Sequence, residues 1–183
     1  MHTLLQTPRL RLRRLTEADG DNLYALDSDP RVMRYIHSGI PHSRAHIMQV
    51  QLPGFLRCNA ETEAPGFVAA LDRETGHFLG WFHLRPTGEG LRELELGYRL
   101  HCEAWGRGLA TEGSRALVDH AFQTLGTRRI IAMALVDNAA SIRVMEKVGM
   151  RYEKSLIEPS TGEPAVVYGV DVAGWNATSR VAS

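Results

Sequence analysis

A turn made of small residues precedes a long helical pattern near the middle of the chain. In the stretch AWGRGLATEGSRALVDHAF, residues 104–122, small residues occupy Gly106, Gly108 and Ala110, and the helical pattern begins at Thr111. The start of a helix offers unpaired backbone N–H groups and a partial positive charge. Because small residues let an anion come close to these groups, the turn is suited to binding a phosphate or a diphosphate.

Two other interpretations of this turn have to be weighed. The glycines could serve only the close packing of a helix against a strand, since a bare glycine pattern is weak evidence for a ligand. A dinucleotide-binding turn is disfavoured, because that fingerprint has Gly or Ala where this chain has Thr111. It also follows a strand directly, whereas HCEAW intervenes here.

Composition narrows the class of protein. The chain has 183 residues, of which 44% are hydrophobic and 23% charged, and 21 basic residues balance 21 acidic ones. These values are typical of one globular domain and give no overall charge that would favour nucleic acid or a membrane surface as a partner. Cys58 and Cys102 lack metal or redox spacing, and the N-terminus lacks a long apolar run. We therefore expect a cytoplasmic location with free thiols.

Hydrophobic patterns predict an alternation of strands and helices. Strands are expected at residues 9–15, 66–72, 78–85, 91–100, 128–136, 150–158 and 165–172. Helices are expected from Thr16, after Pro30, from Ser43 to Pro53-Gly54 (which should end or kink it), over 108–125 and from Asn138 to Gly149.

This order predicts a single α/β domain spanning residues 1–183. Its core is expected at about residues 7–172, and the tail at 173–183 is expected to be flexible. The strand at 128–136, RRIIAMALV, is apolar after its first two residues. We therefore expect the central strands to be covered by helices on both faces.

Two segments together resemble a known family. LELGYRL followed by WGRGLATEG, and then NAASIRVMEKVGMRYE, are similar to the GCN5-related N-acetyltransferases (GNAT), most closely to the RimJ/RimL-type branch that acetylates ribosomal-protein N-termini. Trp105 stands where the family's acetyl-CoA turn has Arg or Gln, whereas Gly108 and Ala110 match. The resemblance runs from Thr7 to about Val172.

The resemblance implies a mixed, mostly antiparallel central sheet, splayed between strand 91–100 and strand 128–136, with acetyl-CoA in the gap. The pantetheine arm would pair with the backbone groups of Tyr98 and Leu100 on strand 91–100, as an added strand does. The diphosphate would sit on the turn, and Asn138 and Ser141 would lie near the arm and the sulfur. The implied cofactor-binding set is Tyr98, Leu100, Gly106, Arg107, Gly108, Leu109, Ala110, Thr111, Asn138 and Ser141. Arg143 and Lys147 are candidates for the 3′-phosphate of coenzyme A, or are simply solvated.

Acetyl transfer to an amine needs a proton acceptor and a proton donor. Glu95 is the candidate acceptor, because an inward carboxylate in a covered sheet must be paired or line a pocket; a salt bridge to a neighbouring Arg is the equal alternative. Ser141 is the candidate donor on family grounds, and its alternative role is to stabilise the first helical turn. Tyr98 and Tyr152 are held in reserve.

The acceptor is expected to be a primary amine, either a protein N-terminus or a small molecule, held by residues 31–60, 86–90 and 159–164. Asp27 and Asp29 could attract a cationic amine or cap a helix. His42 and His46 stand one helical turn apart but lack the Glu of a zinc hydrolase, so no metal is predicted. The alternative function is a non-catalytic acyl-CoA-binding sensor. A homodimer is plausible for this fold.

Overall fold

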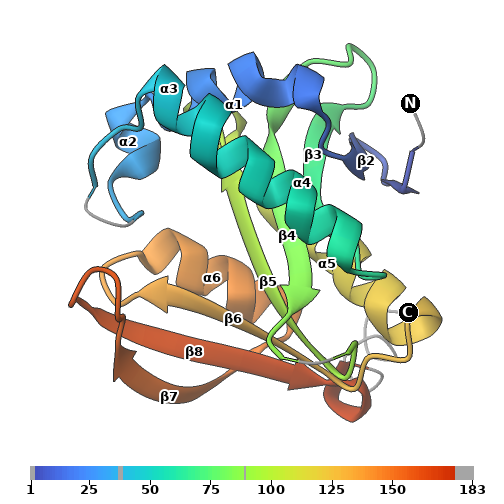
Figure 1. The fold of residues 1–183 in the computed structure, drawn as a ribbon. Coiled ribbons are helices and arrows are strands. Elements are labelled where there is room, and N and C mark those ends of the chain that lie inside the picture. Colours follow the sequence, from blue (N-terminus) through green and yellow to red (C-terminus); the bar gives the residue numbers. More distant parts are fainter. Residues whose placement is uncertain (1–2, 37–38, 89, 176–183) are drawn as a thin grey trace.

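The computed structural model describes residues 3–36, 39–88 and 90–175, and its described strands form one sheet of eight (Figure 1). The spatial order is β1-β2-β3-β4-β5-β6-β8-β7. The bounds are β1 Leu5–Gln6, β2 Leu10–Arg14, β3 Gly66–Asp72, β4 Phe78–Pro86, β5 Glu93–Leu100, β6 Arg129–Leu135, β7 Arg151–Ile157 and β8 Pro164–Asp171. Every neighbouring pair is antiparallel except β5 and β6, which are parallel.

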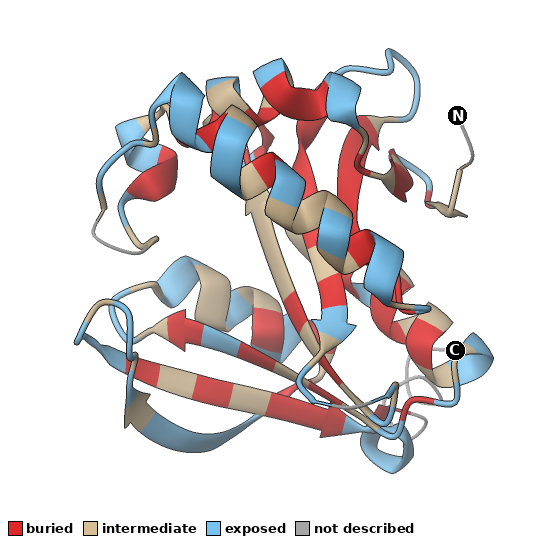
Figure 2. Cartoon of the chain, in the orientation of Figure 1, coloured by how far each residue is buried: buried red, intermediate tan, exposed pale blue. Residues whose placement is uncertain are grey.

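Helices cover both faces of the β2–β5 half of the sheet, each over its own hydrophobic cluster (Figure 2). The N-terminal helices are α1 Gly20–Asp27, α2 Pro30–Met33, α3 Arg44–His46 and α4 Leu52–Glu61. They pack their apolar side chains on Phe67 and Trp81. The opposite face is covered by α5 Leu109–Thr124, which packs on the fully buried Phe82, while α6 Ala139–Val148 lies beside α5 and packs on β6 (Figure 1). No helix within the described ranges is long and apolar enough to span a bilayer.

The sheet opens between β5 and β6. These strands pair at Glu93–Arg129, Leu94–Ile130 and Glu95–Ile131, and beyond Glu95 they diverge as the two arms of a V (Figure 1). The predicted fold is therefore confirmed: a mixed, mostly antiparallel sheet, splayed between strand 91–100 and strand 128–136. The gap leaves one edge of β5 without a neighbouring strand from Leu96 onward.

The helix that was expected to end or kink at Pro53-Gly54 continues to Glu61. It passes through a π-helical segment, η2 Ile47–Gln51, before α4 begins at Leu52. Pro53, which has no backbone N–H to donate, comes directly after the π segment. The wide π turn thus accommodates the proline without ending the helix.

Two further expectations need correction. The strand predicted at 128–136 is not covered on both faces: Ile130 and Ala132 are buried, but Met133 on the other side is 40% exposed, because β5 has diverged and no helix lies over it. The packed core also extends beyond residues 7–172. Leu5 packs against it at one end, and Trp175 is buried at the other. The remaining tail residues, 176–183, lie outside the described part of the chain.

Candidate active site

The turn that precedes α5 has the geometry of an anion cradle. Gly106 and Gly108 adopt left-handed φ angles of 70° and 78°, where a side chain would be strained. The backbone N–H groups of residues 106–111 donate no hydrogen bond to any described residue. Six free amides around a helix start fit a diphosphate, so the residues present are suited to the phosphates of acetyl-CoA.

Two members of the predicted cofactor-binding set sit differently from expectation. Leu109 is buried in the core, so its backbone alone faces the turn. The carbonyl of Leu100 already accepts a hydrogen bond of 2.8 Å from the indole Nε1–H of Trp105. Trp105 therefore tethers the turn to the end of β5, which gives a structural role to the residue that replaces the family's Arg or Gln.

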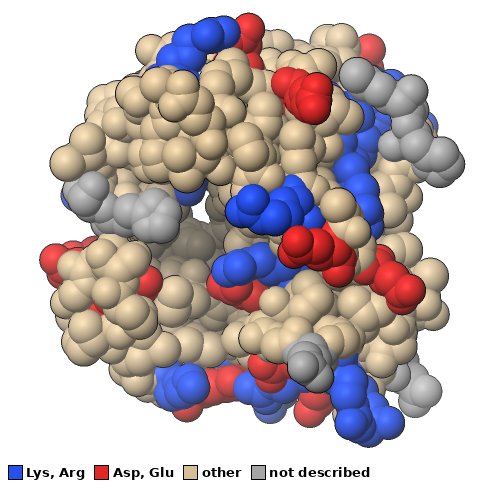
Figure 3. All heavy atoms as spheres, in the orientation of Figure 1, with Lys and Arg blue, Asp and Glu red and all other residues tan. Residues whose placement is uncertain are grey.

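Two cavities meet where β5 and β6 separate. The cofactor-side cavity, of about 330 Å³, runs from Tyr98 past Asn138 and Ser141 to the turn, and Arg143 and Lys147 also line it. Arg107 is exposed and does not line it. The acceptor-side cavity, of about 250 Å³, shares Tyr98, Asn138 and Ser141 with the first. The face in Figure 3 is hollowed at this place, between the N-terminal helices and the β6–β8 layer.

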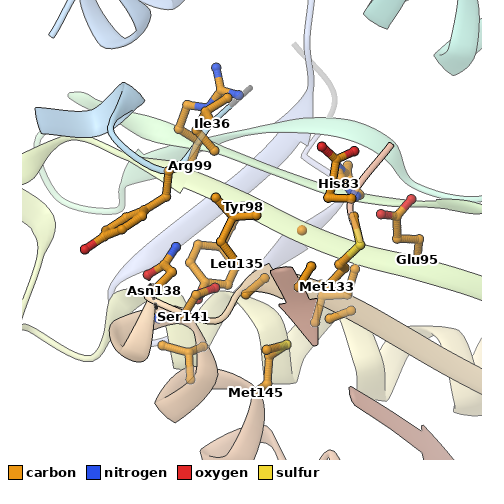
Figure 4. A pocket seen from close by; sticks show the side chains of 18 of the residues that line it. Ile36, His83, Glu95, Tyr98, Arg99, Met133, Leu135, Asn138, Ser141 and Met145 are labelled. Atoms are coloured by element: carbon orange, nitrogen blue, oxygen red, sulfur yellow. Dashed lines mark hydrogen bonds between the residues drawn. The ribbon is translucent and has the colours of Figure 1, made fainter. Parts of the chain in front are cut away.

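A hydrogen-bonded pair of hydroxyls lies where the cavities meet. Asn138 caps α6, and its Oδ1 accepts from the backbone N–H of Ser141 at 3.1 Å. The Ser141 Oγ lies 3.0 Å from the Tyr98 hydroxyl (Figure 4). Burial raises the pKa of Tyr98, although the bond to Ser141 opposes the shift. The phenol is therefore protonated at neutral pH and can act as a proton donor.

Glu95 combines both interpretations made from the sequence. It lines the acceptor-side cavity, and its carboxylate also forms an ion pair of 2.6 Å with Arg85 on β4. Its side chain is 23% exposed. Glu95 and Tyr98 project from opposite faces of β5 and are about 10 Å apart along the strand. Glu95 could therefore reach a reacting amine only through water.

Sequence reasoning missed a row of aromatic and charged side chains beside Glu95. The register pairs Trp81 with Arg99, His83 with Gly97 and Arg85 with Glu95, so all of these share the face that carries the N-terminal helices. Trp81, His83 and Arg99 line the acceptor-side cavity. The alternation in FLGWFHLR predicts the shared face within β4, but the facing residues of β5 depend on a strand register that sequence does not give.

His83 is held as a neutral imidazole. Its ring packs over Gly97, where an added Cβ would lie 2.5 Å from it, and is flanked by Phe67 and Trp81. Burial, with the charges of Arg85 and Arg99, lowers the pKa of His83 to about 3. Neither ring nitrogen has a hydrogen-bond partner among the described residues.

Arg99 forms a buried ion pair with α1. Its Nη1 lies 2.5 Å from the carboxylate of the fully buried Asp27, which also accepts from Gln51 at 2.6 Å. The guanidinium stacks over the Trp81 ring at 5.0 Å. The pair fixes α1 against β5 at the cavity wall, so Asp27 is occupied by Arg99 and does not line either cavity.

Several residues considered from the sequence lie away from the cavities. Tyr152 is 55% exposed on β7 and lines neither cavity. Asp29 caps α2 by accepting from the backbone N–H of Arg31. His42 contacts Gln51 and His46 is exposed, and neither lines a cavity. Of the segments expected to hold the acceptor, residues 31–60 supply Tyr35 and residues 159–164 supply Ser160 to the acceptor-side cavity.

Comparison with known proteins identifies the family. A sequence profile described as the acetyltransferase (GNAT) domain matches residues 9–151. This chain belongs to the GNAT acetyltransferase family. The FsC-acetyl coenzyme A-N(2)-transacetylase of Aspergillus fumigatus is 30% identical to it, over 93% of this chain and 77% of the relative. The Bacillus subtilis protein YkkB, whose function is uncharacterised, is 34% identical over 91% of this chain and 94% of its own length.

The fold agrees with solved GNAT structures. The spermidine N-acetyltransferase of Vibrio cholerae, determined in complex with CoA and spermine, superposes with a TM-score of 0.75. Its sequence is 18% identical, and the match covers 93% of this chain and 99% of that one. This likeness shows the shared fold. Membership of the family makes the chain an N-acetyltransferase.

Proposed function

We propose that this GNAT protein transfers an acetyl group directly from acetyl-CoA to a primary amine while both substrates are bound. The observation that carries this proposal is the meeting of two cavities at Tyr98 and Ser141. One cavity reaches the free amides of the turn, and the other reaches Glu95. Two substrates entering from opposite ends would meet in the gap between β5 and β6.

The cofactor-side cavity supplies what acetyl-CoA needs. In the proposal, the amides of residues 106–111 hold the diphosphate, and Asn138 contacts the pantetheine arm. The backbone edge of Tyr98 and Leu100 pairs with that arm. Arg143 and Lys147 lie at the same cavity and suit the 3′-phosphate. When bound, acetyl-CoA supplies the activated acetyl group as a thioester.

The chain's own side chains handle the protons. Glu95 accepts a proton from the acceptor amine through water, and the ion pair with Arg85 holds the carboxylate in place. The Tyr98–Ser141 pair donates a proton at the position where the sulfur leaves. A covalent acyl-enzyme is not required, because the two cavities let both substrates bind together.

An α-amine is the acceptor that this arrangement serves best. An α-amino group has a pKa near 8 and a lysine amine one near 10.4, a difference of roughly 3 kcal/mol in the cost of deprotonation. A carboxylate that acts through water can manage the first more easily than the second. We include in the proposal a peptide N-terminus, such as that of a ribosomal protein, as the acceptor that the RimJ/RimL-type resemblance implies.

The test is a panel of amines and peptides assayed for release of coenzyme A and for acetylated product. We expect turnover with one or more α-amines and initial-velocity lines that intersect when both substrates are varied. Parallel lines would point to an acyl-enzyme and contradict direct transfer. Tight binding of coenzyme A without product from any amine would favour the alternative, a non-catalytic acyl-CoA sensor.

A further inference from the structure

The N-terminal segment makes a network of contacts with the turn that precedes α5. Glu112, in the first turn of α5, accepts from the Thr7 hydroxyl at 2.6 Å and from the Arg9 backbone N–H at 2.9 Å. It also forms an ion pair of 2.6 Å with the Arg9 guanidinium. The same guanidinium donates to the backbone carbonyl of Arg107 at 2.7 Å. Residues about one hundred positions apart thus meet at the anion cradle.

The bond to Arg107 fixes the direction of an amide. In a trans peptide the C=O of one residue and the N–H of the next point in opposite directions, and the described chain holds no cis peptide. Because the Arg107 carbonyl points to Arg9, the Gly108 N–H points away from Arg9. Gly108 lines the cofactor-side cavity and has a left-handed φ of 78°, a conformation that favours glycine.

The ion pair between Arg9 and Glu112 also offsets the negative charge of Glu112 beside the expected diphosphate site. Glu112 is an acid in the first turn of the helix whose start is to receive a diphosphate. Alone it would stabilise the helix dipole but repel an anionic ligand a few ångströms away. Arg9 pairs with this carboxylate at 2.6 Å and offsets its charge, so the helix start keeps its attraction for an anion.

We propose that Arg9 is a positioning residue for the diphosphate of acetyl-CoA, acting through Glu112 and the Arg107 carbonyl rather than by binding the ligand alone. The inference rests on the proposed placement of acetyl-CoA in the cofactor-side cavity. It predicts that Arg9 matters for ligands that carry the diphosphate and not for ligands that end at pantetheine.

The test compares coenzyme A with pantetheine, and acetyl-CoA with S-acetyl-pantetheine, in Arg9→Ala and Arg9→Lys variants. The Kd is measured by titration calorimetry and turnover by product formation. We expect Arg9→Ala to weaken coenzyme A binding about tenfold, as loss of a charge-assisted hydrogen-bond network does. Its kcat and its Kd for pantetheine should stay unchanged. Arg9→Lys keeps the positive charge but cannot bond the Glu112 carboxylate and the Arg107 carbonyl at once as the guanidinium does. Its affinity for coenzyme A should therefore lie between those of Arg9→Ala and the unaltered protein.

Two further variants sharpen the result. Arg11→Ala, two residues further along in β2, is the control, because Arg11 reaches toward Gly76 and not the turn; it should bind both ligands normally. Adding Glu112→Gln to Arg9→Ala removes the uncompensated charge and should restore part of the coenzyme A affinity.

Each negative outcome has a distinct meaning. If Arg9→Ala weakened the binding of coenzyme A and of pantetheine equally, Arg9 would merely support the fold. If Arg9→Ala bound coenzyme A normally, Arg9 would play no part in binding. Either result overturns this inference and leaves the proposed function standing. Failure of the unaltered protein to bind coenzyme A would overturn both. A melting temperature recorded for every variant separates weakened binding from unfolding.

Discussion

The hydrogen bond between Tyr98 and Ser141 gives the sharpest prediction about catalysis. The two hydroxyls lie 3.0 Å apart where the cavities meet, so each is the other's partner in the described structure. General acid catalysis by a positioned group is worth about 10²–10⁴ in rate. Because the two hydroxyls act together as one donor, we expect Ser141→Ala alone to lower kcat roughly 10²-fold, near the lower limit, which is about 2.7 kcal/mol in the barrier.

The pair should behave as a unit. We expect Tyr98→Phe to lower kcat by a similar factor and the double variant to lose little more, about 10²–10³-fold in total, because groups in one hydrogen bond are not additive. The KM for acetyl-CoA should change by less than about threefold, since the lost interaction belongs to the transition state. The assay is steady-state product formation, with both substrates varied.

A matched pair elsewhere in the chain provides the control. Tyr152 and Ser155 on β7 also have hydroxyls 3.0 Å apart but lie outside both cavities. Ser155→Ala should leave kcat unchanged. The reasoning would be refuted if Ser141→Ala raised KM and spared kcat, or if the two single effects multiplied to about 10⁴, the value for independent groups.

Three further predictions concern charge and burial. Glu95→Gln should lower kcat/KM by about 10²-fold and most at low pH, where fewer amines are neutral, and a pH profile with no such trend would contradict the role. Asp27→Asn leaves the Arg99 guanidinium buried without its counter-charge and should reduce the free energy of unfolding by about 3 kcal/mol in urea titrations; a loss under 1 kcal/mol would contradict it. His83 has its pKa lowered to about 3 in the folded state, so the unfolded chain binds the extra proton. Its contribution is therefore complete above pH 6.5 and falls by up to about 1.4 kcal/mol per pH unit towards pH 3. Unfolding of His83→Leu should lack that slope, and equal slopes would refute it.

Much of the fold could be predicted because the local patterns agree with the global arrangement. Strand 66–72 matches β3 to the residue, and the predicted helix at 108–125 differs from α5 by one residue at each end. Alternation and clear start and stop residues carry this information. The two-residue strand β1 and the π segment before Pro53 leave no comparable signal, because both depend on what the rest of the chain packs against them.

The candidate site also has a part that the sequence predicts and a part that it does not. The glycines at 106 and 108 predict the candidate anion cradle from sequence alone, because the absence of side chains is what would let an anion approach the backbone. The row of Trp81, His83 and Arg99 could not be predicted, because it is assembled by the register between β4 and β5. The same holds for the pairing of Arg9 with Glu112, which depends on two segments meeting across the fold.

A crystal structure of the protein with coenzyme A tests the central claim most directly. The account predicts the diphosphate on the amides of residues 106–111, with the pantetheine arm alongside β5 and its sulfur beside Ser141. A nucleotide bound at another surface, with β5 and β6 drawn together over the gap, would contradict it.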